Sequence, residues 1–266
     1  MKLAANLLTL IVLLTLSCNQ PSKTTSSKSD TPQPLAINQT TSPKVDSFSL
    51  DYIIGKFDPI KHPAFIEIEK KYASREGMRM RKEAYNAFLE MQTAAKKDGI
   101  DLKILSAARP FDHQKSIWEA KWNGKRKVDG QDLSKTMPDA KDRAYKILTY
   151  SSMPGTSRHH WGTDIDLNSL EPDFFEKGEG KKVYDWLASH AGNYGYCQPY
   201  SPKGDERPHG YNEEKWHWSY MPISEGLTQL AQEKLTNEMI SGFQGCLLYT
   251  SPSPRDRQKS RMPSSA

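Results

Sequence analysis

The sequence has little cysteine, with three residues among 266. Cys18 is separated by one residue from an N-terminal apolar run, and Cys246 lies in a C-terminal segment without apolar periodicity, so we expect neither in the folded core. That leaves Cys197, and a lone cysteine cannot form a disulfide within the domain. The fold is therefore expected to depend on its hydrophobic core, with Cys197 as a small buried side chain, and on any metal that it binds.

Long hydrophobic runs are missing beyond the N-terminus. The apolar stretch 7–16 is too short to span a bilayer as a stable helix and, after Lys2, has the organisation of a secretory signal peptide. Ser17 and Cys18 follow it, which is similar to the lipobox of bacterial lipoproteins. We expect a signal peptide at residues 1–17 and lipidation at Cys18, hence an exported protein anchored to a membrane of the bacterial cell envelope. An ordinary cleaved signal with an incidental cysteine is the alternative.

A surplus of one charge sign is absent from the part of the chain that should fold. The formal net charge is +5; Lys2 supplies one of these charges and the segment 244–266 a net three, which leaves about +1 for the rest. Such a balance gives no basis for binding nucleic acid or an anionic membrane surface.

Composition divides the chain into parts. Residues 18–47 hold the lipidated cysteine and a stretch rich in Ser, Thr, Pro, Gln and Lys, which predicts a disordered tether. Residues 244–266 are expected to be an unstructured tail, because this stretch resembles translated vector sequence more than protein evolved to fold. The remaining residues, 48–243, have the length of one domain.

Apolar periodicity within 48–243 predicts both helices and short strands. Helices are expected at 75–97, 111–122, about 140–148, near 181–191 and 225–239, and strands at 102–107, 163–167, about 194–197 and 216–221. These elements show no regular βαβ alternation and no internal repeat. The predicted class is therefore α+β, a single domain with a small, mostly antiparallel sheet flanked by helices.

Two separate segments contain residues suited to binding a metal. A catalytic zinc takes about three N or O ligands from the protein and leaves one position for water. His159 and Asp166 lie within SRHHWGTDIDL (157–167), and His217 lies in the distant EEKWHWSY. A histidine near an aspartate is weak evidence by itself, because most such pairs are simply hydrogen-bonded.

Local geometry supports the same hypothesis. If 163–167 is a strand, Asp164 and Asp166 project to the same face. Gly162 would let the chain turn tightly before that strand.

Glu214 stands three residues before His217, which suits a carboxylate acting as general base on water. In a regular strand these two side chains would face opposite ways, so the role requires a bend near Lys215. Trp216 and Trp218 alternate with His217 and are expected to pack into the core on the opposite face.

The combined pattern resembles the signature of the VanY-type D-alanyl-D-alanine carboxypeptidases, which belong to the zinc DD/LD-peptidases of the bacterial cell wall. It comprises Ser157-x-His159-x-x-Gly162-x-x-x-Asp166 and, downstream, Glu214-x-Trp216-His217. The resemblance extends from about Tyr52 to Tyr220 and implies a DD-peptidase/hedgehog-like fold. It also implies zinc bound by His159, Asp166 and His217, with Glu214 as the catalytic base.

Substrate-binding residues are also implied by the family. An arginine in a Ser-x-x-Arg context engages the substrate there, with a glutamine further on; SAARPFDHQ offers Arg109 and Gln114. Arg109 would hold a carboxylate or stabilise the developing oxyanion. Ser157 is expected either to bind substrate or to cap its loop.

The chain departs from the family pattern at two positions. Asp164 stands where the family usually has alanine, and Ala108 replaces the usual aromatic before the arginine. The first departure raises the question which aspartate contacts zinc, and the spacing favours Asp166. The second is expected to alter the substrate pocket and not the chemistry.

The resemblance implies a zinc carboxypeptidase that removes the terminal D-alanine from peptidoglycan stem peptides through metal-activated water. An L,D-carboxypeptidase or an endopeptidase of the same group stays open, as does a non-catalytic peptidoglycan-binding lipoprotein with a structural zinc. The presence of both Glu214 and Arg109 favours an enzyme, because a purely structural site has no use for a base. The sequence does not decide specificity, the membrane that carries the anchor, or the oligomeric state.

Overall fold

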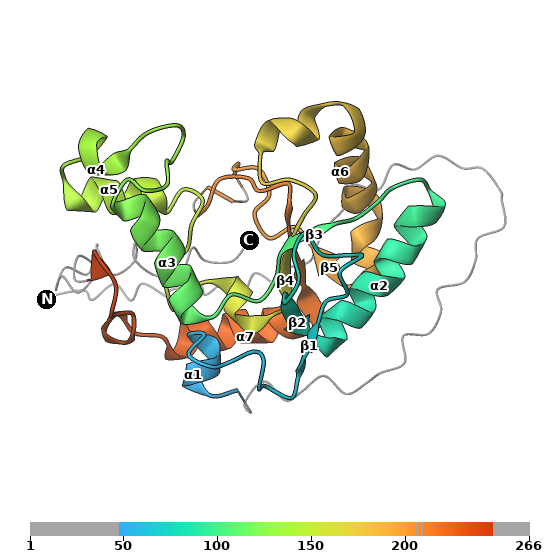
Figure 1. Cartoon of the computed structure of the whole chain (residues 1–266), viewed down its shortest axis with the longest axis horizontal. Helices are drawn as coiled ribbons and strands as arrows, with labels where there is room; N and C mark the ends of the chain where they lie inside the picture. Colours follow the sequence, from blue (N-terminus) through green and yellow to red (C-terminus); the bar gives the residue numbers. More distant parts are fainter. Residues whose placement is uncertain (1–47, 206, 209, 247–266) are drawn as a thin grey trace, which may run out of the picture. The chain divides into compact units, whose positions relative to one another are not determined.

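A four-stranded antiparallel sheet in the order β3-β4-β6-β5 forms the centre of the fold. Its strands are β3 (Ile104–Ser106), β4 (Asp164–Leu167), β6 (His217–Tyr220) and β5 (Tyr196–Cys197). A separate antiparallel pair is formed by β1 (Phe65–Glu67) and β2 (Arg79–Arg81). Helices surround these small sheets (Figure 1), so the α+β class predicted from the sequence is confirmed.

The computed structural model describes residues 48–205, 207–208 and 210–246. The expected signal peptide (1–17), the lipidation site Cys18 and the tether to residue 47 lie outside these residues, and so does the segment 247–266. None of the described helices is long and apolar enough to cross a membrane.

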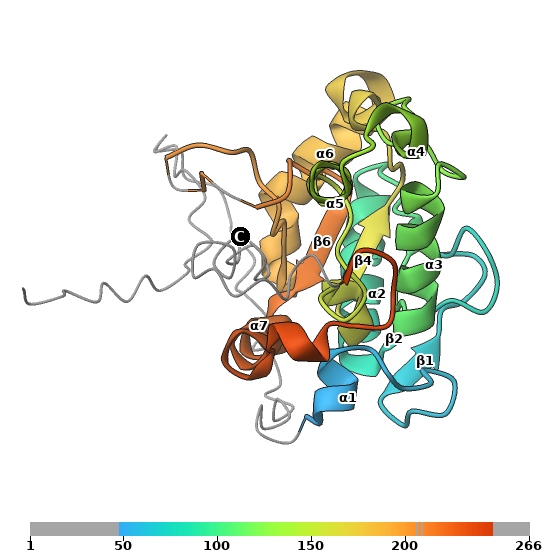
Figure 2. The ribbon, with the colours of Figure 1, turned by 90° about the vertical axis from the view of Figure 1, so that its left-hand side faces the viewer.

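Seven α-helices and several 3-10 helices lie in the described part of the chain. The α-helices are α1 (Leu50–Ile53), α2 (Lys82–Lys97), α3 (Phe111–Trp122), α4 (Leu133–Thr136), α5 (Ala140–Ile147), α6 (Gly178–His190) and α7 (Met221–Lys234). The 3-10 helices are Arg158–Trp161, Pro172–Glu176, Ala191–Tyr194 and Asn237–Met239. Helices α3 and α6 lie on different sides of β4 (Figure 2).

Three groups of buried side chains form the core. The largest joins the sheet to α2 and α6, and includes Trp216 and Trp218 as expected. A second group joins α3, α4 and α5 with Ile240 and Phe243. A third packs α1 and α7 around Trp161. The central sheet is therefore covered by helices, and β4 is buried along its whole length.

The helix expected at 75–97 begins only at Lys82, and Arg79–Arg81 just before it form β2. Met80 in β2 and Met78 just before it both point inward and are almost fully buried. The Arg81 backbone N–H donates to Gly162 O at 2.9 Å, which closes the strand against the loop before β4. The sequence prediction was wrong here because Met78 fits the helical spacing equally well.

The C-terminal part also differs from the prediction. Helix α7 covers Met221–Lys234 instead of 225–239. Gln244, expected to begin an unstructured tail, is held by α3: its carbonyl accepts from Trp118 Nε1 at 2.9 Å and its N–H donates to Glu119 Oε1 at 3.1 Å. The folded region thus extends beyond the expected boundary at residue 243.

Cys197 is disulfide-bonded, so the expectation of a lone buried thiol is wrong. That expectation excluded Cys18 and Cys246 as disulfide partners because of their flanking sequence. Flanking sequence does not determine which sulfur atoms lie close together in the fold. Cys246 is the free cysteine in the described part of the chain.

Candidate active site

The register of β4 against β6 places three polar side chains together. Asp166 pairs with His217, and Asp164 pairs with Ser219 two residues along the ladder. Because strand side chains alternate between faces, both aspartates share a face with His217, as predicted. Ile165 projects the other way, into the core under the sheet.

His159 reaches the same place from the 3-10 helix Arg158–Trp161, which ends in a tight turn at Gly162. Gly162 has φ of +70°, and a Cβ there would lie 2.4 Å from the Phe65 ring. Only glycine fits this turn without strain or displacement of Phe65. The tight turn expected from the sequence is therefore present.

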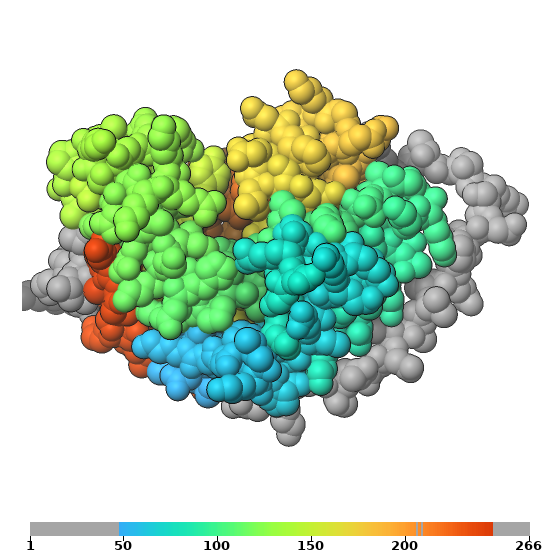
Figure 3. All heavy atoms as spheres, viewed as in Figure 1, coloured from blue at the N-terminus to red at the C-terminus, as the bar shows by residue number. Residues whose placement is uncertain are grey.

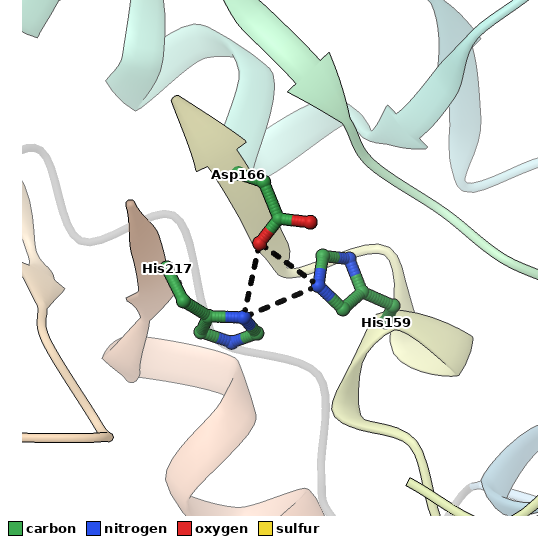
Figure 4. A group of neighbouring side chains, drawn as sticks. All are labelled: His159, Asp166 and His217. Atoms are coloured by element: carbon green, nitrogen blue, oxygen red, sulfur yellow. Dashed lines mark hydrogen bonds and ion pairs between the residues drawn. The ribbon is translucent and has the colours of Figure 1, made fainter. Parts of the chain in front are cut away.

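Three side-chain atoms converge between these segments (Figure 4). His159 Nε2 lies 3.2 Å from His217 Nδ1 and 3.3 Å from Asp166 Oδ1, and His217 Nδ1 lies 3.2 Å from the same oxygen. All three side chains are buried, with exposed fractions of 2%, 3% and 5% for His159, His217 and Asp166. Ligand atoms of a tetrahedral zinc with bonds of about 2.0–2.1 Å lie roughly 3.3 Å apart, so the spacing fits such an ion.

Outer contacts turn the correct ring atoms toward the centre. His159 Nδ1 lies 2.9 Å from Ala107 O, and His217 Nε2 lies 2.8 Å from Asp164 Oδ2. Each ring therefore donates outward and directs its other nitrogen inward, the arrangement typical of metal-bound histidine. Asp166 Oδ1 is buried and accepts no hydrogen bond of normal geometry. A cation held by these three atoms would satisfy that oxygen.

Asp164 does not join this group, which answers the question raised by the sequence. Its carboxylate is fully buried and is held by Arg158 Nε at 2.8 Å, His217 Nε2 at 2.8 Å and Ser219 Oγ at 2.7 Å. Arg158 in turn donates to Thr228 Oγ1 on α7 and to Ser219 Oγ, both at 2.6 Å. Asp164 thus orients His217 and neutralises a buried arginine.

Sequence reasoning missed the role of Arg158. The signal that could have identified it was the unusual Asp164 itself, because a carboxylate buried in a strand requires a cation or several donors nearby. Arg158 stands six residues earlier in the same motif.

Burial and neighbouring charges shift the pKa values of Asp166, His217 and His159. Burial opposes ionisation of Asp166, but the His159 and His217 rings hold the pKa of its carboxyl well below the usual range. Burial favours a neutral His217 ring, yet the carboxylates Asp164 and Asp166 raise its pKa to about 9. Burial, with Arg109 nearby, lowers the pKa of His159. In the metal-free site at neutral pH, His217 therefore carries a proton that a metal ion would displace.

Glu214 lies beside the same three residues, just before β6. The His217 N–H donates to Glu214 O at 3.2 Å, which closes a turn through Lys215 and supplies the bend that the sequence required. Glu214 Oε2 lies 3.6 Å from His217 Nδ1. Burial raises the pKa of Glu214 to about 7, which suits a group that takes up and releases a proton near neutral pH.

Arg109 follows β3 and is anchored through its backbone. Its N–H donates to His159 O at 3.0 Å, and His160 Nδ1 donates to its carbonyl at 2.6 Å. His160 Nε2 accepts from the Gly155 N–H at 3.0 Å, so this ring is buried and structural, not solvent-facing. Arg109 Nη2 lies 3.9 Å from Asp166 Oδ2, while Nε is buried without a hydrogen bond. The guanidinium therefore borders the site with donor capacity to spare.

The two expected substrate-binding residues are both buried. Gln114 Nε2 donates to Ser152 O at 2.7 Å, and Gln114 Oε1 is buried without a partner. The Ser157 side chain makes no capping hydrogen bond, so the alternative in which it caps its loop is wrong. Substrate binding by both residues stays a prediction.

Comparison with known proteins gives several matches. YodJ of Bacillus subtilis (strain 168), which is named as a putative carboxypeptidase, is 31% identical over 58% of this chain and 48% of its own length. The D-alanyl-D-alanine carboxypeptidase of Enterococcus faecalis (strain ATCC 700802 / V583) is 26% identical over 70% of this chain and 63% of its own. The chain thus spans about half to two thirds of these relatives.

Solved structures match with lower similarity. The LdcB LD-carboxypeptidase has 24% identity and a TM-score of 0.47, covering 68% of this chain and 77% of LdcB. VanYB in complex with D-Alanine-D-Alanine has 25% identity and a TM-score of 0.44, covering 61% of this chain and 82% of VanYB.

The family assignment rests on a broader match. The sequence model of the VanY family, described as D-alanyl-D-alanine carboxypeptidase, matches residues 77–223, more than half of the chain. This region contains all four residues that form the site, His159, Asp166, Glu214 and His217. The chain belongs to the VanY family of D-alanyl-D-alanine carboxypeptidases.

Proposed function

We propose that the protein is a zinc-dependent carboxypeptidase that removes the C-terminal D-alanine from peptidoglycan stem peptides. The observation that carries this proposal is the convergence of three buried donor atoms, from His159, Asp166 and His217, with a carboxylate at their border. Membership of the VanY family supports the choice of substrate. Solved VanY proteins are described in complex with Zn(II) and with D-Alanine-D-Alanine.

Each residue has a distinct part in the proposed reaction. His159, Asp166 and His217 would hold the metal, which supplies Lewis-acid polarisation of the scissile carbonyl and acidifies water. Glu214 takes the proton from the attacking water and returns it to the leaving amine. Its position 3.6 Å from His217 Nδ1 and its pKa of about 7 suit both transfers.

Arg109 is proposed to bind the substrate at the other border of the site. Its guanidinium is directed at Asp166 from 3.9 Å and has an Nε donor without a partner. A planar group with fixed donors suits either the substrate carboxylate or the oxyanion that forms during attack. The backbone contacts to His159 and His160 keep it in place.

Mass spectrometry of the products tests the proposal. The zinc-loaded protein is incubated with a muramyl pentapeptide ending in D-Ala-D-Ala, with and without a chelator, beside the Glu214→Gln variant. We expect loss of one alanine, abolished by the chelator and by the substitution, while Glu214→Gln still binds zinc. Full activity of Glu214→Gln would remove the proposed base.

Other cleavage patterns separate the alternatives. Release of alanine only from a tetrapeptide would indicate an L,D-carboxypeptidase, and cleavage within the stem would indicate an endopeptidase. If no substrate is cleaved but zinc-loaded protein binds peptidoglycan, the protein is a binding lipoprotein.

For its location we propose export and anchoring through a lipid on Cys18. The support is the apolar run followed by Ser17 and Cys18, and the Ser-, Thr- and Pro-rich stretch between Cys18 and the domain. Metabolic labelling with a radioactive fatty acid tests this, because a Cys18→Ser variant should not be labelled.

A further inference from the structure

Lys121 on α3 is a buried lysine that the proposed reaction does not use. Only 8% of its surface is exposed, and its Nζ lies 2.5 Å from Ser151 Oγ. Serine is neutral, and no carboxylate among the described residues forms an ion pair with this ammonium group within 4.0 Å. The charge of Lys121 is therefore buried without an opposite charge in contact.

The surroundings increase the cost of this burial. Arg126 and Arg109 place further positive charge near Lys121. Two acids act on Lys121 from a distance: Glu214, beside the candidate active site, and Asp129, which pairs with Lys146 at 2.5 Å. Burial, with Arg126, lowers the pKa of Lys121 to about 8, so the ammonium form persists at neutral pH. Buried charges without partners are costly, and a perturbed ionisable group near a site is a candidate for ligand binding.

Lys121 lies on the side of α3 that acts electrostatically on the candidate active site. It stands seven residues after Gln114 on α3, two helical turns along the same face. Gln114 is the residue with the unpartnered buried Oε1. Lys121 acts electrostatically on Glu214, as Arg109 does. Figure 3 shows the surface hollowed between the part formed by α4 and α5 and the part formed by α6.

We propose that Lys121 and Ser151 form a carboxylate-binding subsite for the peptide substrate on the α3 side of the active site. The inference rests on the proposed function and extends it, because it identifies a second cationic contact besides Arg109. The ammonium group donates up to three hydrogen bonds and needs no planar partner, while Ser151 offers a hydroxyl donor to the same carboxylate.

Two carboxylates of a stem peptide have the required chemistry. The terminal carboxylate lies one residue beyond the scissile carbonyl, and an acidic side chain of the stem is the other source. A substrate whose terminal carboxylate is amidated and one whose side-chain carboxylates are amidated distinguish them. The subsite should discriminate against only one of these amides.

The test compares Lys121→Met and Lys121→Arg with Lys115→Met in the full zinc-loaded chain. Lys115 is a matched control because it lies on the same helix, is partly exposed and pairs with Glu119 at 4.0 Å. Loss of one charge-assisted contact predicts a KM for pentapeptide about tenfold to a hundredfold higher in Lys121→Met, with kcat changed by less than about threefold. Lys121→Arg should recover part of the loss, and Lys115→Met should match the wild type.

Binding without turnover gives an independent measurement. In a Glu214→Gln background, calorimetric titration with the pentapeptide should show affinity at least about tenfold weaker after Lys121→Met. The zinc content and the unfolding temperature should not fall, because methionine fills the buried stem without a charge. Each amidated peptide is titrated into Glu214→Gln and into Glu214→Gln/Lys121→Met. The peptide that binds equally well to both proteins lacks the carboxylate that Lys121 contacts.

The outcomes separate this inference from the proposed function. If the wild type cleaves the peptide and Lys121→Met has an unchanged KM and affinity, the subsite is refuted while the enzyme stands. If the wild type neither cleaves nor binds any stem peptide, the proposed function fails, and the subsite fails with it. If both amides bind as well as the free acids, the subsite is refuted as well.

Discussion

Removal of the Asp164 carboxylate should have two separable effects. The substitution Asp164→Ala leaves Arg158, whose side chain is 9% exposed, without its ion pair. Breaking a buried pair in this way costs about 3–5 kcal/mol, a large share of the roughly 5–15 kcal/mol that stabilises a typical domain. The same change removes the acceptor from His217 Nε2, and loss of such an outer contact lowers metal affinity about 10–100-fold.

The double variant Asp164→Ala/Arg158→Met separates the two effects. With both charges gone, no unpaired cation remains at this position, so most of the lost stability should return. His217 still lacks its carboxylate partner, so zinc affinity should stay low. Stability that recovers while affinity does not is the signature of an aspartate that acts on the metal through histidine.

Urea unfolding of the metal-free chains measures the first effect, and competition with a chromophoric zinc chelator measures the second. The double variant serves as the folded reference, so that weak zinc binding by Asp164→Ala is not mistaken for misfolding. If Asp164→Ala unfolds within about 1 kcal/mol of the wild type and binds zinc within about threefold, the assigned role is refuted.

The remaining predictions concern three other positions. Zinc binds a neutral His217 ring, and the pKa of this ring without metal is about 9. Zinc affinity should therefore rise with pH up to about 9. Calorimetry in buffers of different ionisation enthalpy should detect the release of about one proton on zinc binding near pH 7.5. Burial raises the pKa of Glu214 from 4.5 to about 7, so the stability linked to its protonated form is present below pH 4.5 and lost as pH rises to about 7. Metal-free Glu214→Gln should therefore be more stable than the wild type at pH 8, by up to about 3 kcal/mol, and similar at pH 4; equal stability at pH 8 in urea unfolding would contradict this. Gly162→Ala should cost at least about 2 kcal/mol in the same assay, because of the positive φ and the contact with Phe65, and an unchanged unfolding midpoint would show that the turn relaxes.

Helix α3 shows where local sequence was sufficient. Its observed bounds, Phe111–Trp122, match the prediction, because Pro110 stops the preceding strand and suits the start of a helix. The start of α2 was predicted wrongly, since Met78 fits the helical spacing with Arg81 and Tyr85 as well as it fits an extended segment. Pairing of β2 with β1 decided between them, and that pairing is a long-range contact.

The site divides in the same way. The residue types and the spacing of His159, Asp166, Glu214 and His217 indicated a metal centre with a base, and the resemblance to the VanY-type pattern assigned their roles. The sequence did not assign Asp164 and Arg158, whose ion pair is held in place by Ser219 on β6 and Thr228 on α7.

By itself, then, the sequence determined which chemical groups are available and which segments carry them. The tertiary structure decided which groups meet: it separated Asp166, at 3.2 Å from His217 Nδ1, from Asp164, at 2.8 Å from His217 Nε2. It also buried Lys121 beside Ser151 without a carboxylate in contact. The physical reason is that a side chain's charge and hydrogen-bonding capacity are local properties, whereas its partner and its burial depend on strand register and helix packing across distant parts of the chain.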